Sequence, residues 1–233
     1  MSDELTLAGI DRSDTIAEAR ERLVGADTRG GFLRKLALGG AGAALGSGVM
    51  AALPQIARAA TANDIDILNF ALTLEYPAAA FFTEAERNGM LSGPTLDVAR
   101  VVGAHERAHV RALRSALGAN AVKRGHYDFG EATSDQRKFQ KAALWFEDIA
   151  VGYLKGQAPL IDSDAVLVVA LGLHSVEARH AAWIRHVMGI VPAPHPYDAP
   201  ITRESAVAQF RSRGFLALQP RTVARRRSPT VTG

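Results

Sequence analysis

Two short motifs in this sequence could bind a metal ion. Each is a glutamate followed three residues later by a histidine, and the two motifs are Glu106 with His109 and Glu177 with His180. On an α-helix, residues three apart lie on one face about one turn apart, so both side chains of a pair could reach the same ion. A single pair of this kind occurs often by chance, and its ordinary interpretation is a solvated helix face. The metal hypothesis therefore depends on whether the chain supplies partners for two such pairs.

Two further glutamates complete a matched set. Glu75 and Glu147 each interrupt an apolar stripe, where a charged side chain is costly unless it is paired or bound to a metal. Glu75 precedes Glu106 by 31 residues, and Glu147 precedes Glu177 by 30. Each half of the domain therefore has a lone glutamate on its first helix and a glutamate–histidine pair on its second. A carboxylate-bridged two-metal site in a helical bundle needs this set of side chains.

The residue types indicate which metals the site would hold. Carboxylate oxygens suit iron and manganese and can bridge two ions, while each imidazole adds one nitrogen. Four carboxylates also balance the charge of two divalent ions. We therefore predict two Fe or Mn ions and no catalytic residue distinct from the ligands, which are Glu75, Glu106, His109, Glu147, Glu177 and His180. His105 and His174 are interpreted as packing or supporting residues rather than as ligands.

The elements that must position these side chains are helices. Asn63 or Asp64 is the expected N-cap of the first helix, and Pro77 is expected to kink or bulge it. The irregular stretch over 118–133 can reach about 50 Å, farther than the roughly 36 Å of a 24-residue helix. The pattern predicts an all-α four-helix bundle with a long crossover between helices 2 and 3, plus a short C-terminal helix over 202–211. The four bundle helices are expected over about 64–88, 94–117, 135–154 and 164–188.

The residues before the bundle are typical of an export signal. A basic stretch over 28–35 precedes a Gly- and Ala-rich apolar run over 36–53, and Ala57-Arg58-Ala59 resembles a cleavage site. The arrangement is similar to a twin-arginine signal, although Gly30 stands where the second arginine is expected. We predict cleavage near Ala59-Ala60, periplasmic or extracellular localisation, and membrane attachment only through an uncleaved signal. The domains are then 1–59, an export signal with a long n-region; 60–190, the bundle; and 191–233, an extension with a basic disordered tail.

Composition excludes several classes of site. The chain contains no cysteine, which rules out disulfides, zinc–thiolate sites, iron–sulfur clusters and cysteine nucleophiles. The chain has a net charge of +3, and the four arginines in its last thirteen residues account for this whole excess of positive charge. No basic patch accompanied by groove-reading elements is visible along the chain, so nucleic acid is not a predicted partner.

Four segments resemble a known family. They are Asn69-Phe70-Ala71-Leu72-Thr73-Leu74-Glu75-Tyr76, Tyr127-Asp128-Phe129, Gly152-Tyr153 with Gly156-Gln157-Ala158-Pro159, and Glu177-Ala178-Arg179-His180. Over about 62–190 the chain resembles the ferritin-like superfamily and, within it, exported bacterial ferritin-like proteins related to plant desiccation-associated proteins. The resemblance implies a di-iron or di-manganese site with the six residues above as ligands. It implies no single activity, because the fold hosts storage, oxidation and peroxide chemistry.

Two main functions are consistent with these features. The first is an exported oxidoreductase that oxidises Fe(II) or handles O2 or peroxide, with metal ions and small oxidants as its partners. The alternative is a non-catalytic bundle that protects against stress or desiccation and keeps a vestigial or structural metal site. An iron-storage cage would need 12 or 24 subunits, and the export signal and tail argue against it. Assembly into a smaller homo-oligomer is consistent with the sequence.

Overall fold

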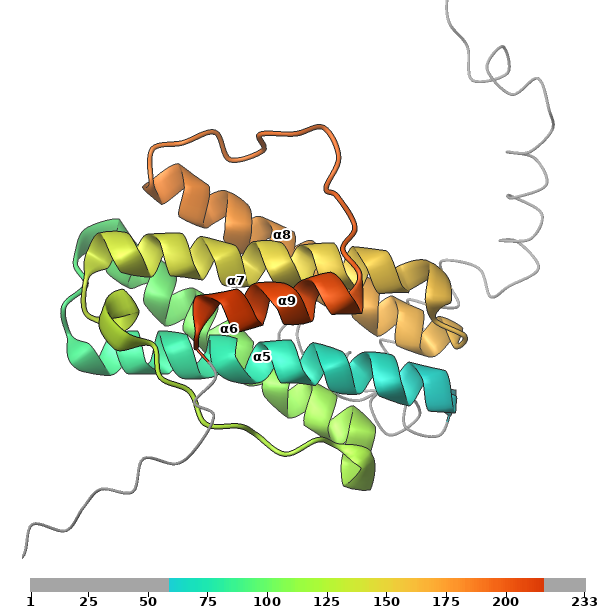
Figure 1. Cartoon of the computed structure of the whole chain (residues 1–233). Helices are drawn as coiled ribbons and strands as arrows, with labels where there is room; N and C mark the ends of the chain where they lie inside the picture. The colour runs from blue at the N-terminus through green and yellow to red at the C-terminus, as the bar shows by residue number, and fades with distance from the viewer. Residues whose placement is uncertain (1–58, 216–233) are drawn as a thin grey trace, which may run out of the picture. The chain divides into compact units, whose positions relative to one another are not determined.

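The structure is a computed structural model that describes residues 59–215. Four long helices form a bundle: α5 (Ala62–Asn88), α6 (Gly93–Leu117), α7 (Gln136–Gln157) and α8 (Asp164–Val187). The pairs α5–α6 and α7–α8 make the most extensive contacts, and a fifth helix, α9 (Arg203–Arg213), lies against α7 (Figure 1). Residues 59–215 contain no β-strand. The predicted all-α bundle with a short C-terminal helix is confirmed, while the predicted signal and basic tail lie outside the described residues.

The first helix begins two to three residues earlier than the sequence indicated. Thr61, not Asn63 or Asp64, is the N-cap, and its hydroxyl accepts a hydrogen bond from the backbone N–H of Asp64 at 3.2 Å. The Asp64 carboxylate accepts the Thr61 N–H at 3.0 Å, which completes a capping box. The same carboxylate accepts the N–H of Asp162, just before α8, at 2.9 Å. The cap itself is a local Thr-x-x-Asp pattern, but the sequence prediction placed it at the later polar residues Asn63 and Asp64.

Pro77 does not interrupt α5. The helix is continuous from Ala62 to Asn88 and ends at Gly89, whose φ of 64° is left-handed. A proline inside a helix removes one backbone hydrogen bond. Here Tyr76, Pro77 and Ala78 are all buried in the bundle, and their packing holds the helical path. The helix is therefore unbroken at Pro77, and the kink or bulge that the sequence predicts there stays a prediction.

The crossover between α6 and α7 follows α5 and is held there by side chains of that helix. It contains two short 3-10 turns, η1 (Gly118–Asn120) and η2 (Gly130–Thr133). Asn69 donates to the Asn120 carbonyl at 3.0 Å and accepts the Val122 N–H at 2.9 Å. The Tyr76 hydroxyl donates to the Val122 carbonyl at 3.0 Å, and Asn88 donates to the Thr133 carbonyl at 3.1 Å. These bonds satisfy backbone groups that would otherwise lack partners in an irregular segment.

Two aromatic layers stabilise the interior above and below the level of the glutamates. At one level the ring of Phe70 lies 4.7 Å from that of Tyr153, whose hydroxyl donates to the Ile67 carbonyl. At the other, Phe81 stacks on Phe139 with centroids 5.1 Å apart. Glu75 lies between these layers in the sequence of α5, and Glu147 lies between them in α7. Buried rings on both sides exclude water from the space where the charged side chains meet.

Two of the described helices, α5 and α8, are long and apolar enough to cross a membrane by length and composition alone. Two thirds of the apolar window of α5 is buried inside the bundle. Each of these helices also carries a buried glutamate, Glu75 on α5 and Glu177 on α8. Only 39% of the apolar window of α8 is buried, so the apolar residues of α5 build the core together with one face of α8.

The segment after α8 returns across α7 and packs on it closely. Ile201 donates its N–H to the Gly152 carbonyl at 2.9 Å. Gly156 lies so close to the backbone of Ile201 that a Cβ at this position would be 2.3 Å from the Ile201 carbonyl oxygen. Farther along, the ring of Phe210 on α9 lies 4.7 Å from that of Trp145. The two glycines of α7 therefore let the C-terminal segment cover this helix.

Gly156→Ala is expected to displace this segment and to lower the unfolding free energy by about 1–3 kcal/mol, the usual cost of overpacking. The matched control is Gly172→Ala in α8, where no atom lies within 4 Å of the added methyl group. That change should be neutral or stabilising by up to about 1 kcal/mol, because alanine favours helix over glycine. Urea unfolding followed by tryptophan fluorescence measures both variants. Equal stability of the two variants would contradict the close packing.

Candidate metal centre

The bundle brings all six predicted ligand residues together in its interior. The four glutamates are between 1 and 3% exposed, and His180 is 4% exposed. His109 is more accessible, with 13% of its side chain exposed. The six side chains come from all four bundle helices, with Glu75 on α5 and Glu147 on α7 facing the two glutamate–histidine pairs of α6 and α8. Their role as metal ligands stays a prediction, and the geometry below bears on it.

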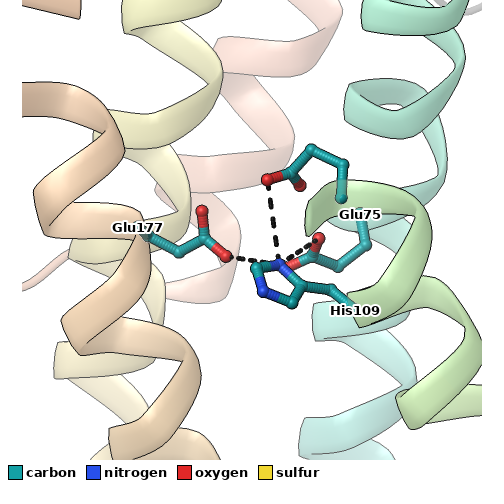
Figure 2. A group of neighbouring side chains, drawn as sticks. Glu75, His109 and Glu177 are labelled. Carbon is teal, nitrogen blue, oxygen red and sulfur yellow. Dashed lines mark ion pairs between the residues drawn. The ribbon is translucent and has the colours of Figure 1, made fainter. Parts of the chain in front are cut away.

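His109 is the centre of the first half of the cluster. Its Nδ1 lies 2.8 Å from Oε1 of Glu177, 3.6 Å from Oε2 of Glu75 and 3.7 Å from Oε1 of Glu106. Figure 2 shows Glu75 and Glu177 approaching the same nitrogen from opposite sides. Three helices thus contribute carboxylates to one imidazole nitrogen.

His180 occupies the equivalent place in the second half. Its Nδ1 lies 3.0 Å from Oε2 of Glu147, 3.1 Å from Oε2 of Glu177 and 3.4 Å from Oε1 of Glu106. Both histidines therefore present Nδ1, the ring nitrogen nearer the backbone, to the carboxylates. Their Nε2 atoms are left for other partners.

The six residues form two overlapping groups that could each hold a metal ion. One group contains Glu75 and His109, the other contains Glu147 and His180, and both contain Glu106 and Glu177. Within each group the candidate ligand atoms lie within 4.8 Å of one another. Sequence reasoning predicted that carboxylates could bridge two ions but did not say which, because only the spatial arrangement identifies the shared pair.

Unsatisfied buried atoms show that these residues fit a cation. Five of the six have a buried nitrogen or oxygen with no hydrogen bond of acceptable geometry among residues 59–215, namely Glu75 Oε2, Glu106 Oε1, His109 Nδ1, Glu147 Oε1 and Glu177 Oε1. His109 Nδ1 and Glu177 Oε1 are close, but their angle is not that of a hydrogen bond. Leaving a buried polar atom unpaired costs roughly 1–3 kcal/mol. Oxygen and imidazole donors that converge in this way match the preferences of Fe and Mn.

The pKa values of Glu106, Glu147 and Glu177 lie far from the usual range of a carboxyl group. Burial raises the pKa of Glu106 and of Glu147 well above the ordinary value, and the nearby charge of Glu177 adds to the rise. Burial also acts to raise the pKa of Glu177, but His109 and His180 outweigh it and hold that pKa well below the ordinary range. In metal-free protein, carboxyl groups that favour the protonated form therefore lie beside one that favours the ionised form.

The pKa values of the two imidazoles are also raised, but by the nearby carboxylates and against the effect of burial. Burial acts to lower the pKa of His109, but the carboxylates of Glu177 and Glu75 outweigh it and raise the pKa to about 11. Burial likewise acts to lower the pKa of His180, while Glu106 and Glu177 raise it to about 9. Both rings are thus cationic in metal-free protein at neutral pH. Metal binding would have to displace these protons, because a ligating imidazole must be neutral at the ligating nitrogen.

His105 supports His180 from outside the cluster. Its Nδ1 lies 2.9 Å from Nε2 of His180. Burial lowers the pKa of His105, and the neighbouring His180 and His109 lower it further. A neutral His105 accepts the Nε2–H of His180, which leaves His180 Nδ1 directed at the carboxylates. The sequence interpretation of His105 as a supporting residue agrees with this contact, whereas His174 belongs to neither group.

Comparison with known proteins gives one result for this chain. The family model described as a ferritin-like domain matches residues 63–189, the segment that contains all six clustered residues. No curated protein matches the chain significantly.

Glu147→Gln is expected to stabilise the metal-free protein increasingly as pH rises. The folded-state pKa of Glu147 is raised above its ordinary value of 4.5. The stability linked to its protonation is therefore fully present below about pH 4.5 and is lost as pH rises toward the folded pKa. Glutamine keeps the shape and carries no ionisation penalty. The unfolding free energy of Glu147→Gln, relative to that of wild type, should therefore rise by up to about 1.4 kcal/mol per pH unit over that range.

Urea unfolding between pH 5 and 8, on protein stripped of metal, measures this difference. Glu131→Gln is the control, since 77% of the Glu131 side chain is exposed. A pH-independent difference, or a Glu147→Gln variant less stable than wild type at pH 8, would contradict the assigned direction of the shift.

Proposed function

The chain belongs to the ferritin-like family, and on that basis we propose that it is a metal-dependent redox protein with a dinuclear Fe or Mn centre. Its activity would be oxidation of Fe(II) or handling of O2 or peroxide. The observation that carries the proposal is the pair of overlapping ligand groups that share Glu106 and Glu177. Two ions that share two carboxylates would be held close enough to act on one small oxidant.

Each side chain has a distinct place in the proposed centre. Glu75 and His109 would bind one ion, and Glu147 and His180 would bind the other. Glu106 and Glu177 lie within reach of both and would bridge them. Four carboxylates and two neutral imidazoles leave no net charge around two divalent ions, which removes the cost of burying four acids together.

The centre would supply two electrons at a time: two Fe(II) ions, two protons and one hydrogen peroxide give two Fe(III) ions and two water molecules. The protein contributes the surroundings. The aromatic layers keep bulk water away, and burial raises the pKa of Glu106 and of Glu147, so these carboxyls favour the protonated form before metal binds.

We also propose export of the protein. The motif at Ala57-Arg58-Ala59 would direct cleavage near Ala59-Ala60, immediately before the Thr61 cap. Cleavage there would leave the capping box of α5 intact in the mature chain. A role in stress or desiccation protection, with the metal purely structural, is the alternative that the next experiment separates.

Metal analysis of the native protein should find close to two Fe or Mn per chain. Glu106→Ala and Glu177→Ala should lose both ions, because each removes a shared ligand. Glu75→Ala and Glu147→Ala should retain about one. Glu131→Ala, at an exposed site, should retain both.

Peroxide-dependent Fe(II) oxidation, followed by absorbance, should be rapid in wild type and lost in Glu106→Ala. A native protein without metal would overturn the proposed centre. Two bound ions without any oxidation would overturn the redox function and favour a structural role.

His105→Ala is expected to lower the affinity for the ion bound by His180 by about 10- to 100-fold. This is the usual effect of removing the hydrogen-bond partner of a metal-bound histidine. The affinity for the ion at His109 should change little. Titration with Mn(II) should therefore resolve one tight binding step and one weakened binding step. His174→Ala is the matched control, since His174 lies on the same helix as His180 but outside the ligand groups. Equal weakening of both steps would show that His105 does not act through His180.

A further inference from the structure

A groove of about 790 Å³ lies between α5, α6 and the crossover segment. Its size is in the range of small-molecule sites. Tyr76 and Arg87 both line it and are 11 residues apart on α5, which is about 16 Å along the helix axis. The groove is therefore long enough for a molecule larger than a single phosphate ion.

The lining of this groove is strongly basic. Five arginines from three separate elements face it, namely Arg87, Arg107, Arg111, Arg114 and Arg124. His126 lines it as well. Among the described lining residues, Glu84 is the one carboxylate, and it already accepts a hydrogen bond from the Thr133 hydroxyl at 2.6 Å.

Most of these arginines have no ion-pair partner among the described residues. Arg107 pairs with Glu86 at 2.8 Å. The other four make no ion pair with any residue of 59–215, and all four are exposed. The guanidinium of Arg124 lies 6.0 Å from the centre of the Tyr127 ring, which also lines the groove. Within residues 59–215, no carboxylate occupies the donors of these four arginines.

Composition does not account for this concentration of charge. Residues 59–215 contain sixteen lysines and arginines against seventeen aspartates and glutamates, a net charge of −1. Nearly a third of the basic side chains nevertheless line one groove. Arg107, Arg111 and Arg114 follow one another at intervals of four and three along α6, where like charges repel and destabilise a helix. An arrangement that costs stability and leaves donors unused is typical of a binding site.

We propose that this groove binds a small multivalent oxyanion, such as an oligophosphate or a polycarboxylate. The guanidinium group presents paired N–H donors that match two oxygens of a phosphate or a carboxylate. Arginines from α5, α6 and the crossover line the same groove, and they favour a molecule that carries several anionic groups. The site is separate from the proposed metal centre, although Tyr76 and Arg107 are the chain neighbours of Glu75 and Glu106.

Titration calorimetry on the full-length chain tests this site, with inorganic tripolyphosphate and citrate as probes. The protein is used free of metal, because both probes chelate metal ions. Wild type should bind at least one probe saturably at one site per chain, and the affinity should fall as salt is added. Arg111→Glu combined with Arg114→Glu should weaken binding at least about tenfold, since hydrogen bonds to charged groups are among the stronger ones.

The matched control combines Arg100→Glu, on the same helix, with Arg137→Glu. Both are exposed and neither lines the groove, so binding should be retained. Arg111→Gln with Arg114→Gln provides a milder change if the glutamate variant is unstable. Vesicles containing phosphatidylglycerol distinguish a lipid headgroup from a soluble anion as the source of the phosphate.

Saturable binding of a soluble probe, or of vesicles, that is lost in the Arg111/Arg114 variants supports the site and identifies the source of the anion. Absence of binding to every probe, or equal weakening by the control pair, overturns it. None of these outcomes depends on whether the interior cluster binds metal, so the two proposals fail separately.

Discussion

Four carboxylates buried within a few ångströms of one another are the constraint on which this structure depends. Such a group cannot remain fully ionised in a dry interior, because desolvation and mutual repulsion both oppose it. In metal-free protein burial favours protonation of Glu106 and Glu147, while Glu177 is ionised and both histidines are cationic. Metal ions would replace protons and imidazolium charge in the same space.

The surrounding packing holds these charges at one level of the bundle. The aromatic layers around Phe70 and Phe81 exclude water on either side. The capping box at Thr61 and the bond from Asp162 to Asp64 fix the beginning of α5 beside the beginning of α8. The crossover is fastened along α5 by Asn69 and Asn88, and the C-terminal segment is fastened along α7 through Gly156. The aromatic layers and the Asp162–Asp64 bond join elements that contribute side chains to the centre, and the other contacts hold covering segments against those helices.

The pair α5–α6 carries opposite charges on two of its faces. Its inner face presents Glu75 and Glu106 to the centre, and another face presents Arg87 and Arg111 to the groove. Adjacent residues on a helix point about 100° apart, so the same turns can serve both without mixing them. Positive charge outside an acidic interior also lowers the electrostatic cost of the carboxylates, although solvent screens most of this effect at the exposed positions.

The sequence by itself determined the helices, their order and the six clustered residues, because those depend on local spacing. A period of 3.6 residues defines the inner face of each helix. Three-residue intervals place Glu106 with His109, and Glu177 with His180, on that face. Tertiary structure alone decided which carboxylates are shared and that His105 supports His180, since both follow from how two helix pairs face each other. It also decided that Pro77 leaves the helix unbroken and that arginines spread over 87–124 line one groove. These features depend on contacts between residues far apart in the chain, and local spacing carries no information about such contacts.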